Sequence, residues 1–293
     1  MLMNKFKGTG TALVTPFNDD YSIDYESLKK LVRLQIDGGV DFLVVQGTTG
    51  ESPTLDAIEK EKVLATVIEE NNGRLPIVFG VGGNDTVKTA KEFKTLPKGI
   101  DGILSVSPYY NKPVQAGIYE HYRILAESTD LPIILYNVPG RTGSNVSAET
   151  TLRLAEIENI TAMKEASGNL DQIMEIIRCK PKGFDLLSGD DAITLPLIAS
   201  GAAGVISVVS NALPEKFSKM VKSVLATDLL TAKEIHYDLL LITRYFFEEG
   251  NPGGVKCALS ARNVMKKVMR LPLFPISKEL EIRINDEMFR LLK

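Results

Sequence analysis

The chain has 293 residues, of which 44% are hydrophobic and 24% are charged. This length fits two ordinary domains or one large α/β barrel with an appendage. The 34 Lys and Arg residues stand against 37 Asp and Glu residues, a net charge of -3, so no surface for nucleic acid or an acidic membrane is expected. No apolar run approaches the roughly 18 residues of a membrane helix.

Two further features bear on the cellular compartment. The residues from Met1 to Gly10 lack the apolar core and the small-residue cleavage pattern of a secretory leader. Cys179 and Cys257 stand far apart and outside any metal-binding motif, so both are expected to be buried thiols in a reducing compartment. The sequence therefore predicts a cytoplasmic protein without a disulfide framework.

Short apolar runs alternate with amphipathic segments along most of the chain. Eight runs are predicted to be strands: Thr9–Val14, Phe42–Val45, Ile77–Phe79, Gly102–Val106, Ile133–Tyr136, Ile160–Lys164, Asp185–Ser188 and Gly204–Ser207. Seven helical patterns separate them: Asp24–Asp37, Asp56–Glu70, Asp85–Thr95, Gln115–Glu127, Ala148–Leu154, Leu170–Cys179 and Asp191–Ser200. This alternation favours an all-parallel sheet covered by helices, and eight strands are the number at which such a sheet closes.

The strand signal stops after Ser207. Four helical patterns follow, with the breaker Gly250–Gly254 inside the series: Leu213–Leu225, Leu229–Glu249, Val255–Lys267 and Lys278–Leu292. We therefore predict a (β/α)8 TIM barrel that is catalytic over residues 1–225, and a C-terminal helical region over residues 226–293. Because no low-complexity linker separates the two, the appendage is expected to pack against the barrel.

One lysine stands at the end of a predicted strand. Lys164 follows the apolar run Ile160–Met163 and precedes a turn and a helix start. A lysine in this place is costly, because low dielectric disfavours its ammonium form. A lone strand-end lysine is more often structural, with its end reaching solvent. An uncharged amine, however, attacks carbonyls and forms Schiff bases, which makes Lys164 a candidate nucleophile.

Polar segments are predicted at the carboxyl ends of other strands, where the active site of a (β/α)8 barrel lies. These segments are Gly47–Glu51, Ser107–Asn111, Tyr136–Gly143 and Ser188–Asp191. Each alone has an ordinary interpretation as a turn, a helix cap or a rim aromatic. Together they bring hydroxyl groups, one arginine and one lysine to one face, which favours a catalytic site.

Schiff-base chemistry also needs a proton relay and, for an acidic substrate, a cation. His121 and His236 lie inside helical patterns away from strand ends, which disfavours histidine as the acid or base. Tyrosine and threonine hydroxyls remain as relay candidates, and Arg141 is the natural partner of a carboxylate. No cluster of His, Cys or carboxylate residues has metal-ligand spacing, so neither a metal nor a cofactor is predicted.

Taken together and in order, these motifs resemble the dihydrodipicolinate synthase family over essentially the whole chain. The resemblance rests on five segments: Gly47–Glu51, Ser107–Pro113, Tyr136–Gly143, Lys164–Gly168 and Ser188–Asp191. The Gly-Thr-Thr-Gly-Glu and lysine motifs alone indicate only the wider superfamily of pyruvate-dependent lyases and aldolases. Arg141, within Gly-Arg-Thr-Gly, narrows the resemblance from this superfamily to the synthase family.

The resemblance implies the condensation of pyruvate with L-aspartate 4-semialdehyde in lysine and diaminopimelate biosynthesis. By that analogy Lys164 forms an imine with pyruvate, and the derived enamine attacks the aldehyde. Tyr136 is implied to be the general acid/base, with Thr48 hydrogen-bonded to it. Tyr110 is implied to complete the relay from a neighbouring subunit, and the family's assembly implies a homotetramer built from tight dimers.

Substrate binding is implied for four further positions. Thr49 and the backbone at Gly189 and Ile206 correspond to positions that hold the pyruvate carboxylate or nearby groups. Arg141 corresponds to the position that binds the carboxylate of the semialdehyde. No cofactor is implied.

A second pocket departs from the family pattern. Ser52, Asn84 and Tyr109 match positions that line an allosteric pocket at the tight dimer interface of lysine-inhibited relatives. Lys88, however, stands where a carboxylate holds the ammonium of the inhibitor in those relatives. Because a cation repels a cationic ligand, the sequence predicts weak or absent inhibition by lysine.

Two other functions stay open on sequence grounds. An N-acetylneuraminate or 2-keto-3-deoxy-sugar-acid aldolase of the same superfamily shares the lysine and tyrosine but takes a polyhydroxylated acceptor, whereas Arg141 favours a small acidic aldehyde. A non-catalytic binding barrel is the second alternative, since a fold does not fix a function. Such a barrel is expected to lack Lys164 or the tyrosines, and all of them are present.

Overall fold

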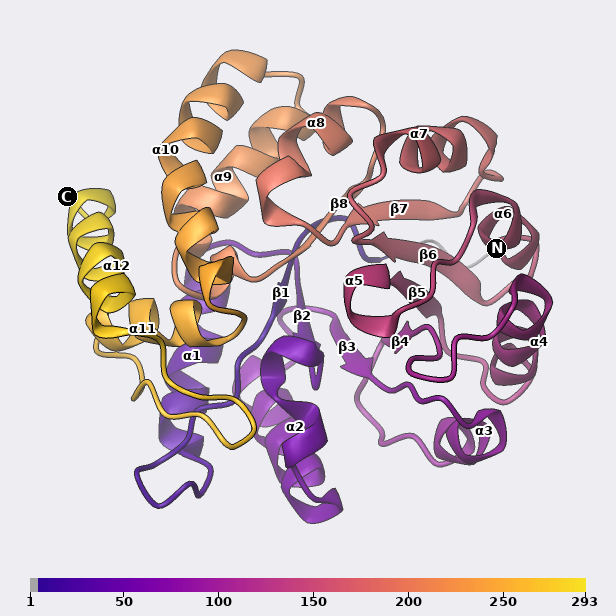
Figure 1. Ribbon diagram of the computed structural model, residues 1–293, viewed down its shortest axis with the longest axis horizontal. Coiled ribbons are helices and arrows are strands. Elements are labelled where there is room, and N and C mark those ends of the chain that lie inside the picture. Colours follow the sequence, from indigo (N-terminus) through magenta and orange to yellow (C-terminus); the bar gives the residue numbers. More distant parts are fainter. Residues whose placement is uncertain (1–4) are drawn as a thin grey trace.

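The computed structural model describes residues 5–293, and at its centre eight parallel strands form a closed barrel (Figure 1). Neighbouring strands follow chain order, and β8 pairs with β1 to close the barrel. The predicted (β/α)8 TIM barrel is confirmed, although residues 1–4 of its range lie outside the described part. The strands are β1 Gly8–Ala12, β2 Phe42–Val45, β3 Ile77–Gly80, β4 Gly102–Val106, β5 Ile133–Asn137, β6 Ile160–Glu165, β7 Asp185–Ser188 and β8 Gly204–Ser207.

Helices alternate with the strands and cover the outside of the barrel (Figure 1). The side chains of Asp24 and Asp56 accept hydrogen bonds from backbone N–H groups of the first turns of α1 and α2, which is why these starts were predictable. The barrel helices are α1 Tyr25–Asp37, α2 Ala57–Asn71, α3 Thr86–Lys94, α4 Gln115–Ala126, α6 Ala148–Leu154, α7 Leu170–Cys179, α8 Thr194–Ala199 and α9 Pro214–Leu225.

Side-chain alternation along the strands divides the apolar residues into two cores. In β6, Met163 belongs to the large core between strands and helices, whereas Ala162 belongs to the small core inside the barrel. In β5, Ile134 and Tyr136 are also in the inner core. Because the side-chain period of a strand is two, Lys164 follows Ala162 on the inner face.

The C-terminal helices, orange to yellow in Figure 1, lie along one side of the barrel. They are α10 Leu229–Glu248, α11 Gly253–Ala261 and α12 Lys278–Leu291, and α10 packs against both α9 and α12. The prediction of one helix over Val255–Lys267 was wrong at both ends. Gly254 lies inside α11, where a Cβ would come within 2.6 Å of the Phe246 Cα, so glycine lets α11 approach α10 closely. Asn263 adopts a positive φ of 56° just beyond the helix.

Three sequence expectations concern membranes, metals and thiols. Within residues 5–293 no helix has both the length and the apolar character to cross a membrane. In the same range no three His, Cys, Asp or Glu side chains are grouped so that they could hold a metal ion. Both cysteines are free, but only Cys257 is buried. The prediction of a buried thiol was wrong for Cys179, which is exposed at the end of α7.

Candidate active site

Lys164 lies near the carboxyl end of β6, directly beside Tyr136 of β5. The two residues are register partners, and the Lys164 Nζ lies 4.3 Å from the centre of the Tyr136 ring. Both side chains are buried. A Cβ at Gly189 would lie 3.1 Å from the Lys164 Cε and 2.7 Å from the Ala166 Cβ, so glycine makes room for the lysine at this strand end.

A cavity of about 580 Å³ opens beside Lys164. Thr48, Thr49, Arg141 and Gly189 line it together with Tyr136 and Lys164, so six of the predicted site residues lie around one space. A second cavity of about 420 Å³ adjoins the first, since both are lined by Thr48, Tyr136 and Arg141. Concave sites of this size suit small-molecule ligands.

The two threonines sit on a short turn, η1 Thr48–Gly50, that follows β2. Thr49 is buried, and its Oγ1 accepts a hydrogen bond from the Asn251 Nδ2 at 2.9 Å. Thr48 is exposed toward both cavities. The hydrogen bond implied between Thr48 and Tyr136 is absent from the described structure, although both side chains line the same two cavities.

Arg141 is carried by α5 Pro139–Thr142, a four-residue helical turn at the end of β5. Its side chain lines both cavities. Within residues 5–293 no carboxylate forms an ion pair with it, so the guanidinium is available to a ligand carboxylate.

Two of the predicted residues line neither cavity of the described chain. Tyr110 is 86% exposed and lines neither cavity of its own chain. The Ile206 side chain is buried in the inner core below the site, which leaves only its backbone for the predicted contact.

The predicted allosteric residues are divided between two places. Ser52 and Tyr109 line the smaller cavity, and the Asn84 Nδ2 donates to the Tyr109 carbonyl at 3.1 Å. Lys88 is exposed on α3 and lines neither cavity. These residues therefore do not form one enclosed pocket within the described chain.

A buried polar network behind Lys164 was missed by sequence reasoning. Glu165 is fully buried, and its carboxylate accepts hydrogen bonds from the Asn137 Nδ2 at 3.0 Å, the Gln172 Nε2 at 3.1 Å and the Ser167 N–H at 2.6 Å. The network ties the ends of β5 and β6 together beside the lysine. Strand alternation does indicate that Glu165 faces away from the barrel interior, but no local pattern indicates its partners.

The two aspartates after β7 have different roles. Asp190 caps the turn η3 Asp191–Ile193 by accepting from the Ala192 N–H at 2.9 Å. Asp191 instead accepts from the Val208 N–H at 3.0 Å, which holds the end of β8. Burial raises the pKa of Asp191 to about 6.

Residues from the C-terminal region also line the larger cavity, which the sequence did not predict. They are Thr243, Arg244, Phe247 and Glu248 of α10, and Asn251 in the segment before α11. The sequence signal here was the breaker Gly250–Gly254, which was predicted only to interrupt the C-terminal helices.

Comparison with known proteins decides the family. The family model described as the dihydrodipicolinate synthetase family matches residues 5–288. The chain belongs to the dihydrodipicolinate synthetase family. The resemblance noted in the sequence is thereby confirmed.

Members of the dihydrodipicolinate synthetase family match this chain over nearly its whole length. The 4-hydroxy-tetrahydrodipicolinate synthase of Flavobacterium psychrophilum is 49% identical over 285 residues, which are 97% of each chain. The crystal structure of dihydrodipicolinate synthase from Aquifex aeolicus is 42% identical, with a TM-score of 0.94 over 98% of each chain. A chloride-inhibited synthase from Acinetobacter baumannii, complexed with pyruvate, is 38% identical, with a TM-score of 0.94 over 97% of this chain and 98% of that one.

Proposed function

We propose that the protein condenses pyruvate with L-aspartate 4-semialdehyde through a Schiff base on Lys164 and yields 4-hydroxy-tetrahydrodipicolinate. The observation that carries this proposal is the buried Lys164 amine, which shares one cavity with Tyr136 and with Arg141. Among the described residues no carboxylate pairs with Arg141. The family of this chain supports the proposal, because its relatives are named 4-hydroxy-tetrahydrodipicolinate synthase. So does the pyruvate complex of the Acinetobacter baumannii relative.

The reaction begins with attack of the Lys164 Nζ on the carbonyl carbon of pyruvate. The carbinolamine loses its oxygen as water, which needs a proton donor, and leaves an imine. Loss of a proton from the pyruvate methyl gives an enamine, whose carbon bonds to the aldehyde carbon while the aldehyde oxygen takes up a proton. The substrate amine then attacks the imine carbon, closes the ring and releases Lys164.

The proton transfers are assigned to hydroxyl groups. Tyr136 lies against the Lys164 amine, so it is our candidate for the acid and base of imine formation. Thr48 lines the same cavity and is our candidate for the next member of the relay. Thr49 and the backbone at Gly189 and Ile206 are our candidates for holding the pyruvate carboxylate.

Tyr110 acts in this proposal on a neighbouring subunit. Tyr110 is 86% exposed, and its backbone adopts a positive φ of 74°. Exposed aromatic residues are frequent anchors of protein interfaces, and the smaller cavity beside Thr48 and Tyr136 offers a receiving site. We therefore propose a homotetramer built from tight dimers in which each Tyr110 completes the partner's relay.

The proposal includes the location of the protein and the division of its chain. Free Cys179 and Cys257 suit a reducing cytoplasm. The catalytic barrel is assigned to residues 1–225 and the C-terminal helical region to residues 226–293, with α10 as the first helix of that region.

Replacing Arg141 by alanine tests both the function and the second substrate. The wild type is expected to turn over pyruvate with aspartate semialdehyde and to leave N-acetylneuraminate and 2-keto-3-deoxy sugar acids uncleaved. Arg141→Ala is expected to raise the KM of the semialdehyde about 10- to 100-fold, because a charge-assisted hydrogen bond is lost. The KM of pyruvate is expected to change much less in the same steady-state assay.

The matched control is Arg153→Ala, since this arginine stacks on Tyr119 at 4.3 Å outside the two cavities. It is expected to keep wild-type constants for both substrates. If Arg141→Ala raises the KM of pyruvate as much as that of the semialdehyde, Arg141 does not have the assigned role. Preferred cleavage of a sugar acid by the wild type would replace the synthase with the aldolase alternative.

Inhibition by free lysine is expected to be weak or absent. Lys88 presents a cation where sensitive relatives are expected to present a carboxylate, and the amino group of the inhibitor is itself cationic at neutral pH. The measurement is initial rate against lysine concentration for the wild type and for Lys88→Glu. Sub-millimolar inhibition of the wild type would contradict the prediction, whereas inhibition that appears only in Lys88→Glu would support it.

A further inference from the structure

Asn251 joins the C-terminal segment to the turn that carries the two active-site threonines. Its side chain is 8% exposed and lines the same cavity as Lys164. The Nδ2 group donates to the Thr49 Oγ1 at 2.9 Å across 202 positions of sequence. The Oδ1 atom is buried and has no partner among the described residues.

A buried ion pair fixes the same two segments a few residues away. Lys256, in α11, pairs with Glu51, directly after the threonine turn, and both side chains have no exposed surface. The other Glu51 oxygen, Oε2, accepts from the Arg270 N–H at 3.1 Å. Both oxygens of the Glu51 carboxylate therefore bind residues of the C-terminal region, and these contacts fix the threonine turn.

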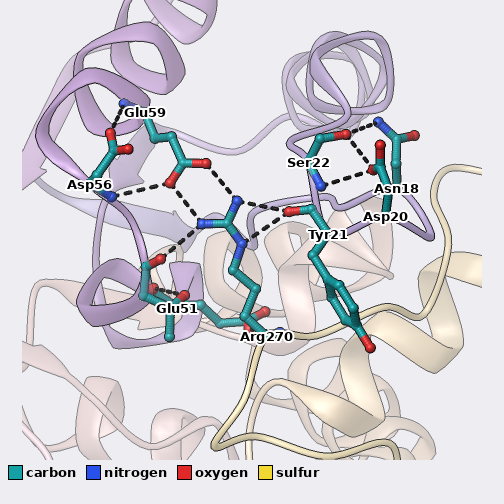
Figure 2. Close-up of polar contacts among 9 residues, drawn as sticks. Asn18, Asp20, Tyr21, Ser22, Glu51, Asp56, Glu59 and Arg270 are labelled. Carbon is teal, nitrogen blue, oxygen red and sulfur yellow. Dashed lines mark hydrogen bonds and ion pairs between the residues drawn. The ribbon is translucent and has the colours of Figure 1, made fainter.

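Arg270 extends this attachment outward, as Figure 2 shows. Its guanidinium donates to both Glu59 oxygens, at 2.5 and 2.7 Å, and to the carbonyls of Tyr21 and Thr54. Arg270 and Glu59 are only partly buried, but several hydrogen bonds from one guanidinium hold together the parts that they join. Asn251 thus approaches Thr49 from a firmly held segment.

The Asn251 contact decides which way the Thr49 hydroxyl group points. A threonine hydroxyl has one hydrogen to donate and two lone pairs that accept. Since the Asn251 amide occupies a lone pair, the hydroxyl hydrogen of Thr49 stays free to donate into the cavity. A donor is what a carboxylate ligand requires there.

We propose that Asn251 is a positioning residue for the pyruvate half of the reaction: it holds the Thr49 hydroxyl as a donor to the substrate carboxylate. The inference rests on the proposed function. It assigns a role in pyruvate binding to the C-terminal region, whose other residues in the cavity come from α10.

The experiment measures imine formation alone, as the pyruvate concentration that half-saturates borohydride trapping followed by intact mass. Asn251→Asp keeps the shape but accepts the Thr49 hydrogen and adds a negative charge, so we expect this concentration to rise about 10- to 100-fold. Asn251→Ala leaves the hydroxyl free to rotate, and a smaller rise of about 3- to 10-fold is expected. The KM of the semialdehyde is expected to stay within about threefold.

The order of the two variants separates positioning from packing. A residue that only fills space would tolerate the isosteric aspartate better than alanine, so a larger effect of Asn251→Ala would overturn the proposal. In a Thr49→Val background, Asn251→Ala is expected to have no further effect, because the hydroxyl that it positions is gone. A further loss there would also overturn it.

The matched control is Asn263→Asp, the same chemical change on an exposed residue of the C-terminal region. It is expected to keep the wild-type half-saturation. Unfolding temperatures within about 4 °C of the wild type would show that the variants fold. If Asn251→Asp unfolds at a lower temperature than that, the comparison of Asn251→Ala with and without Thr49→Val decides alone. A wild type that traps no pyruvate would reject the proposed function itself, whereas normal wild-type trapping with unchanged Asn251 variants would reject only this inference.

Discussion

Replacing Lys164 by alanine is expected to abolish the trapping of pyruvate by borohydride and to lower turnover by at least about 1000-fold. The covalent route is lost with the amine. The residues beside Lys164 at the adjoining strand ends are Tyr136 and Gly189, and neither has an amine that could form the imine instead. The measurement is the intact mass of the protein after reduction in the presence of pyruvate, together with the steady-state rate.

The control for this experiment is Lys182→Ala, which removes an exposed lysine near the end of α7. It is expected to trap pyruvate as the wild type does. A mass increase in Lys164→Ala would move the chemistry to another amine. Lys256, the other buried lysine among the described residues, would then be the first to examine.

The second large effect is expected on stability, from Lys256→Met. This change leaves the Glu51 carboxylate buried without its partner, and such a loss costs about 3–5 kcal/mol in the free energy of unfolding. Denaturation with urea, followed by circular dichroism, measures it. Lys219→Met, on the exposed face of α9, is the matched control and is expected to change the free energy by less than about 0.5 kcal/mol.

The double variant Glu51→Gln/Lys256→Met is expected to recover most of that loss. Burial lowers the pKa of Lys256 to about 8 even though Glu51 acts in the opposite direction, so the desolvation of the ammonium outweighs the attraction within the pair. Two neutral side chains avoid this desolvation. A double variant that is as unstable as Lys256→Met would contradict this account.

The barrel was predictable because its strands are short, nearly continuous apolar runs at regular spacing. Phe42–Val45 was predicted with the bounds that the structure has. The direction of Lys164 was also within reach, since strand alternation carries it inward from Ala162. Local patterns of this kind persist in the fold because each run is buried on both of its faces.

The parts that escaped prediction depend on short turns or on distant contacts. The helical turn that carries Arg141 has only four residues, too few to show a period. The partners of Glu165 and of Thr49 come from other elements, and no local pattern encodes such pairs. Gly253 and Gly254 were taken as a break, but they begin α11. Gly254 packs closely against α10, and Gly253 packs against Ile276 and Met269.

The contact between Thr49 and Asn251 also joins two segments that are made at different times during synthesis. A nascent chain that has emerged as far as α9 already contains Lys164, Tyr136 and Arg141, yet one wall of the larger cavity has not left the ribosome. Because a contact across 202 positions must wait for the later segment, the larger cavity is enclosed only after α10 and the segment before α11 have docked. A chain interrupted after α9 therefore contains Lys164 but lacks Thr243, Phe247 and Asn251, which line one side of the cavity around it.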